Sequence, residues 1–273
     1  MNAVTAEALA SWLPAPGSDL YYAHLYAPAA ERETLAALAA LRAVIAEIPA
    51  TCSAPTIALP KLSWWRDEMG QLARGTPRHV LTRALQGCDP DVPGAGLALV
   101  SGVEALLGAP PFASRAARHA ALLASHGPLW ACALRRCAPA TASVPAAALA
   151  LAARVEEAYV LRDARPLRDG GLQLLSSDSE AAAAQRLGSL PGTAGDWHAA
   201  VLREDISDLR HALAMALAAL PERRVWRPLA TLARLALATL DEIARSDYRV
   251  WESRIELTPL RKLWLALRER HGL

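Results

Sequence analysis

The sequence predicts an all-α protein, and three observations carry this prediction. Hydrophobic residues make up 53% of the 273 residues, and they are mostly Ala and Leu at the three- and four-residue spacing of a helix face. Val, Ile and Thr are sparse, and no stretch alternates apolar with polar residues as a half-buried strand does. Pro and Gly interrupt the pattern at intervals that suit helix ends.

The positions of Pro and Gly predict where each helix begins and ends. Ser18 and Asp19 can cap a first short helix that ends near Pro28. Further helices are expected at 30–48, 57–74, 77–85, 95–107, 112–136, 144–163, 196–219, 222–246 and 258–270. Residues 162–197 are expected to be irregular, with one short helix near 179–187. Because no long polar linker and no internal repeat divides the chain, residues 1–273 are expected to form a single domain.

Composition excludes several classes of protein. A net charge of +2 without a basic stripe argues against nucleic-acid binding. The four cysteines lack C-x-x-C or zinc-ligand spacing, which indicates reduced thiols in a cytoplasmic protein. The N-terminus has no secretory pattern, and the longest apolar runs are roughly half of a membrane span. We expect a soluble protein that is at most peripheral to the inner face of a membrane.

The segment KLSWWRDEM carries the densest group of aromatic and charged residues. Lys61, one of the two tryptophans and Glu68 can share one helix face. The plain interpretation is that the tryptophans are core residues, and that Glu68 and its charged neighbours form a solvated face.

Three segments resemble the squalene/phytoene synthase family. Residues 21–43 are similar to the opening helices of the family, residues 61–69 and 75–85 to its Trp-Trp-Arg segment and the Pro-His segment that follows, and residues 246–268 to its last helix. The resemblance implies an isoprenoid (terpenoid) synthase-like helical bundle. It implies an enzyme that joins two prenyl diphosphates head to head in squalene or phytoene biosynthesis. It also implies Mg²⁺, an isoprenoid or lipid ligand, and peripheral membrane contact.

The aspartate pairs that such chemistry needs are missing from both expected segments. Mg²⁺ prefers carboxylate oxygens, and two Asp four residues apart on a helix reach the same metal cluster. Residues 46–51 offer only Glu47, and Pro49 interrupts the helix. Residues 156–169 contain no pair of aspartates at this spacing. The candidate residual metal ligands are Glu47, Glu156, Glu157 and Asp163.

Where the second acidic pair should lie, Arg162, Arg165 and Arg168 recur every three residues. If this segment is helical, they form a basic face that can bind an anion or a lipid phosphate without a metal. The alternative is salt bridges to nearby acidic residues. The aromatic residues available to line a cavity are Tyr22, Trp64, Trp65 and Tyr159.

Three functions remain open on the sequence. The first is a non-catalytic family member, similar to the mitochondrial complex I assembly factor branch, that binds an isoprenoid or acts on a protein partner. The second is an active prenyl transferase with altered ligands, the only case that calls for Mg²⁺. The third is a structural helical protein without a cavity. The C-terminal RKLWLALRERH fits an interfacial helix, but its leucine spacing favours packing against the bundle.

Overall fold

The computed structural model describes residues 10–52, 54–139, 142–187 and 194–271. Its helices are α2 Asp19–His24, α3 Arg32–Ala46, α4 Pro55–Ala73, α5 Val80–Ala84, α6 Val92–Leu106, α7 Arg115–Cys137, α8 Ala146–Arg162, α9 Ala164–Asp169, α10 Ser177–Leu187, α11 Ala194–Ala218, α12 Arg227–Arg245 and α13 Pro259–His271. Short 3-10 turns are η1 Ala29–Glu31, η2 Pro49–Thr51 and η3 Arg249–Trp251. Across these described ranges the extended pairings are two isolated bridges, so the predicted all-α class is confirmed.

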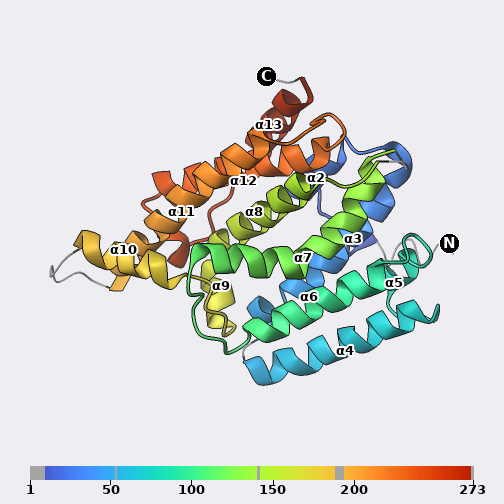
Figure 1. Cartoon of the computed structure of the whole chain (residues 1–273), viewed down its shortest axis with the longest axis horizontal. Helices are drawn as coiled ribbons and strands as arrows, with labels where there is room; N and C mark the ends of the chain where they lie inside the picture. The colour runs from blue at the N-terminus through green and yellow to red at the C-terminus, as the bar shows by residue number, and fades with distance from the viewer. Residues whose placement is uncertain (1–9, 53, 140–141, 188–193, 272–273) are drawn as a thin grey trace.

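Two apolar clusters make up most of the core. One is built on α3, α4, α5 and α6, and the other on α8, α11 and α12. Helix α7 joins them, because Leu129 and Cys132 pack into the first cluster while Trp130 and Leu134 pack into the second. In Figure 1, α4 lies at one edge of the bundle, α12 and α13 lie at the opposite edge, and α7 and α8 lie between them.

The helix missed by the sequence prediction is α9, inside the stretch expected to be irregular. Pro166 is compatible with it, because the third residue of a helix needs no intrahelical partner for its N–H. Gly171 follows the helix with φ +92°, a conformation that favours glycine. Gly170 packs so tightly on η2 that an added Cβ would lie 1.9 Å from the Pro49 oxygen. Glycine at this position therefore lets α9 contact the turn that follows α3.

Helix α13 packs against the bundle as expected, but not through a continuous leucine stripe. Its most buried residues are Lys262, Ala266 and Glu269, because Lys262 pairs with Asp19 and Glu269 pairs with two arginines of the bundle. Leu260, Trp264 and Leu267 are 78%, 53% and 38% exposed. No helix in the described part of the chain combines the length and apolar character needed to cross a bilayer.

Candidate functional site

A cavity of about 830 Å³ is lined by residues of α2, α3, η2, α6, α7, α8, α9, η3 and α13. Much of its wall is apolar, with side chains that include Leu20, Ala43, Ala46, Leu106, Leu122 and Val160. Its volume falls within the usual range of small-molecule pockets. Both segments in which the acidic pairs were expected contribute residues to this cavity.

Glu156 of α8 lies in the cavity wall, and each of its carboxylate oxygens accepts a hydrogen bond. Arg42 Nη1 donates to its Oε2 at 2.7 Å, and the Trp130 indole N–H donates to its Oε1 at 2.8 Å. The side chains of Glu156 and Arg42 are 4% and 11% exposed. A carboxylate held by a guanidinium and an indole has little capacity left for a metal ion.

Two further polar side chains line the wall near Glu156. His126 Nε2 lies 4.0 Å from Glu156 Oε2, and its Nδ1 lies 2.9 Å from Ser125 Oγ. Burial lowers the pKa of His126, so its imidazole is neutral near pH 7. Tyr159, one turn further along α8, is the predicted aromatic residue that does line the cavity.

A second polar cluster lies at the junction of α8 and α9. Arg162 binds Asp163 through its Nη2 at 2.5 Å, and Arg254 Nε lies 3.2 Å from the same carboxylate. Burial alone would lower the pKa of Arg162, but the hydrogen bond to Asp163 and its charge outweigh burial and raise it. Asp19 adds a partner for Arg162 at 3.7 Å and for Lys262 at 2.9 Å. Each of these cations is therefore paired with a carboxylate.

Arg162 and Arg165 line the cavity together, whereas Arg168 lies outside it, which corrects in part the expectation of one basic face. The chain turns at Asp163, between α8 and α9, so the three-residue spacing does not continue along one helix. Arg165 lines the cavity and donates to the carbonyls of Trp251 and Glu252 at 3.0 and 3.2 Å. Arg168 stacks on the Trp251 ring at 4.3 Å, beside a separate pocket of about 300 Å³. The anion-binding role of Arg162, Arg165 and Arg168 stays a prediction.

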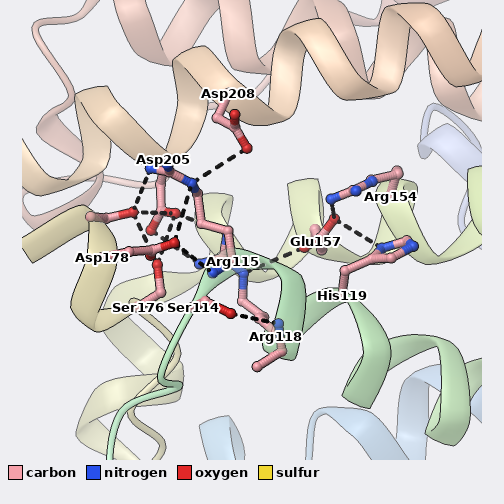
Figure 2. A network of polar contacts seen from close by, with 12 residues as sticks. Ser114, Arg115, Arg118, His119, Arg154, Glu157, Ser176, Asp178, Asp205 and Asp208 are labelled. Atoms are coloured by element: carbon pink, nitrogen blue, oxygen red, sulfur yellow. Dashed lines mark hydrogen bonds and ion pairs between the residues drawn. The ribbon is translucent and has the colours of Figure 1, made fainter. Parts of the chain in front are cut away.

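Glu157 faces away from the cavity, which corrects its grouping with the other candidate ligands. It is fully buried and contacts Arg154 at 2.8 Å, His119 at 3.3 Å and Arg118 at 3.6 Å, as Figure 2 shows. Burial alone would raise the pKa of Glu157, but the His119 contact and the two arginines lower it overall. Adjacent helical residues point about 100° apart, so Glu156 and Glu157 serve different environments.

The donor set does not fit a magnesium cluster. Glu47 lines the mouth of the cavity and is exposed, while Glu156 and Asp163 are held by arginines. Among the residues that the structure describes, no three His, Cys, Asp or Glu side chains converge closely enough to hold a metal ion. A cluster that neutralises a diphosphate needs several free carboxylate oxygens, and these positions do not supply them.

The other aromatic candidates lie outside this cavity. Tyr22 packs in a small apolar cluster with residues of α12 and α13. Trp65 is buried in the core cluster of α3 to α6, and Trp64, 40% exposed, packs edge-on against it. The expectation that Glu68 is solvated is wrong, because its buried carboxylate accepts from the backbone N–H groups of Arg78 and His79 at 2.7 and 2.8 Å.

Several residues that line the cavity were not predicted from the sequence. Arg42 is a cation within the apolar Ala/Leu-rich stretch that follows the first turn of α3, and that placement is the available signal. His126 sits in an apolar part of α7 and offered a similar signal. Lys262 and Arg254 gave no signal, because only the packing of the C-terminal segment brings them to Asp19 and Asp163.

Comparison with known proteins supports the predicted family and fold. Residues 13–117 match the family model described as Squalene/phytoene synthase. No curated protein sequence matches the chain. Among solved structures, the crystal structure of a dehydrosqualene synthase in complex with ligand superimposes with a TM-score of 0.73. The two chains are 14% identical, and the alignment covers 98% of this chain and 97% of the other. The expected isoprenoid synthase-like fold is thereby confirmed.

Proposed function

We propose that the chain, whose residues 13–117 match the squalene/phytoene synthase family model, is a non-catalytic member of that family that binds an isoprenoid chain in the cavity without Mg²⁺. The observation that carries this proposal is the pairing of Glu156 with Arg42 inside a cavity of about 830 Å³. An apolar, elongated ligand gains from burial against the Leu, Ala and Val side chains of the wall.

The state of the acidic residues supports the loss of catalysis. Ionising a prenyl diphosphate requires cations that neutralise the pyrophosphate as it leaves. Glu156 and Asp163 are bound by arginines, and Glu157 lies on the other side of α8. An active prenyl transferase with altered ligands, the alternative function, would have to rely on Glu47 or break these ion pairs.

Calorimetric titration with farnesyl thiodiphosphate, a non-ionising analogue, and with farnesol tests the proposal. Each ligand is titrated with and without Mg²⁺, and farnesyl diphosphate is incubated in parallel to detect condensation. We expect binding of the farnesyl chain without Mg²⁺, no change on adding Mg²⁺, and no product. Mg²⁺-dependent binding followed by turnover would establish the transferase instead.

A cavity-filling substitution tests where the ligand binds. Ala46 lines the cavity, so Ala46→Trp is expected to abolish farnesyl binding by occupying the space. Ala116→Trp, on an exposed position of α7, is the matched control and should bind normally. If neither farnesyl compound binds the unmodified protein, the isoprenoid proposal fails and a protein partner becomes the leading function.

Peripheral membrane contact is the second part of the proposal, supported by the exposed apolar residues of α13. Leu260, Trp264 and Leu267 recur at four- and three-residue spacing, and Arg268 stacks on the Trp264 ring at 4.6 Å. An exposed apolar face edged by arginine suits the surface of an anionic bilayer. Helix α13 also begins at the cavity, which Pro259 and Lys262 line.

Co-sedimentation with vesicles tests this contact. We expect more protein on vesicles that contain phosphatidylglycerol than on phosphatidylcholine alone, and a marked loss of binding in Trp264→Ser. Met215→Ser is the control, because Met215 is an exposed apolar residue of α11. Equal binding of the two variants would exclude α13 as the contact.

A further inference from the structure

Two residues that line the cavity carry polar groups with unused hydrogen-bonding capacity. The Tyr159 hydroxyl is buried and has no hydrogen-bond partner among the described residues. His126 uses its Nδ1 on Ser125, while its Nε2 lies beyond hydrogen-bond distance of Glu156. Glu156 lies close to both residues: it is one turn before Tyr159 on α8, and its Oε2 lies 4.0 Å from His126 Nε2.

The protonation states make the two groups complementary. Burial, reinforced by the charge of Asp19, raises the pKa of Tyr159 well above its ordinary value, so the phenol keeps its proton and can donate. Ser125 has one hydroxyl proton, and it donates this proton in a hydrogen bond to the Ala121 carbonyl at 2.8 Å. His126 Nδ1 therefore donates to Ser125, and the neutral ring leaves Nε2 as an acceptor. A donor and an acceptor together match a hydroxyl group.

The charges of the cavity disfavour a highly anionic ligand. Five cationic side chains and six carboxylates line it, so the wall has no surplus of positive charge. The buried cations are already used: Arg42 by Glu156, and Lys262 by Asp19. Without a metal ion, a diphosphate here would have to displace these carboxylates, and separating a buried ion pair is costly.

Building on the proposed function, we propose that the cavity takes an uncharged isoprenoid alcohol, or another long-chain alcohol, rather than a prenyl diphosphate. The hydroxyl of the ligand accepts from Tyr159 and donates to His126 Nε2. The chain lies along the apolar wall formed by residues such as Ala46, Leu106 and Val160. The pairing of Arg42 with Glu156 keeps the interior neutral, and this neutrality selects against charged head groups.

Three ligands with one common tail test this inference by calorimetry without Mg²⁺. Farnesol can use both groups, farnesyl methyl ether can accept from Tyr159 but cannot donate to His126, and farnesyl thiodiphosphate is anionic. We expect farnesol to bind most tightly, with the ether weaker by roughly two- to tenfold, the value of one hydrogen bond. Tyr159→Phe should weaken farnesol binding by a similar factor. Tyr22→Phe, in an apolar cluster away from the cavity, should leave it unchanged.

The outcomes separate this inference from the proposed function. Tighter binding of the thiodiphosphate than of farnesol would overturn the uncharged class while leaving isoprenoid binding intact. Unchanged farnesol affinity in a folded Tyr159→Phe protein would overturn the placement of the hydroxyl. Failure of all three farnesyl ligands to bind would instead refute the proposed function itself.

Discussion

Glu156 and Glu157 are neighbours on α8, yet they belong to two different regions of the molecule. Glu156 faces a cavity, where one guanidinium and one indole hold it beside an open apolar space. Glu157 faces the buried network of Figure 2, in which Arg118 binds Asp205 through two contacts of 3.0 Å. The comparison teaches that buried carboxylates at neighbouring positions can serve a ligand site and a scaffold respectively.

The largest effect is expected from Arg118→Met in the scaffold network. Arg118 is 1% exposed and lies between two fully buried carboxylates, Glu157 and Asp205. Its removal leaves buried negative charge, so the free energy of unfolding should fall by about 3–5 kcal/mol. Urea unfolding followed by circular dichroism measures this. Arg66→Met is the control, because the ion pair of Arg66 with Glu104 is partly exposed. Equal losses in the two variants would contradict a special role for the network.

The two regions should also differ in their dependence on pH. Burial, with the charge of Arg42, lowers the pKa of His24 to about 4, and burial lowers that of His126 as well. The unfolded chain binds protons first, so stability is complete above about pH 6.5 and falls as the pH drops toward 4. His24 alone accounts for about 3 kcal/mol of that loss. The lowered pKa of Glu157 stabilises the folded protein, and this contribution is lost only as the pH falls below the unfolded pKa of 4.5.

Stability measured by urea unfolding between pH 7 and 4 checks this difference. His24→Gln removes one titrating group near Arg42, so the stability of this variant should fall less over the same interval. A slope identical to that of the unmodified protein would contradict the assignment to His24.

A paired substitution on α8 is expected to separate ligand binding from stability. Glu157→Gln should lower the free energy of unfolding by about 2 kcal/mol, because it weakens charge-assisted contacts. It should leave the affinity for farnesol unchanged. Glu156→Gln frees the charge of Arg42 inside the cavity, so it should shift the preference from farnesol toward farnesyl thiodiphosphate. Calorimetry of the two folded variants measures this, and the same preference in both would remove the distinction.

The smallest effect is expected at the edge of the scaffold network. Arg154 binds Glu157 at 2.8 Å, but its side chain is 23% exposed. Because solvent screens the pair and Arg118 and His119 still contact Glu157, Arg154→Ala should cost about 1 kcal/mol or less. Chemical unfolding measures this value. A loss as large as that of Arg118→Met would show that the network depends on its rim rather than on its buried centre.

Much of the fold could be read from the sequence because helix signals are local. The expected helices at 57–74 and 144–163 correspond to α4 Pro55–Ala73 and α8 Ala146–Arg162. Helix α9 was missed, because Pro166 and Gly170 resemble loop signals when their packing against η2 is unknown. Glu68 was wrongly predicted to be solvated for a related reason: the backbone N–H groups that it binds, those of Arg78 and His79, lie beyond the end of its own helix.

The sequence by itself determined the all-α class, the resemblance to the squalene/phytoene synthase family and the lack of paired aspartates in both expected segments. Only the tertiary structure decided that Glu156 meets Arg42 across 114 positions of the chain, and that Glu157 turns to Arg118. Helical periodicity fixes the angle between neighbouring side chains, but it does not fix which of them faces a cavity. That choice depends on how each helix is rotated when its apolar face packs against its neighbours, and the packing involves residues from the whole chain.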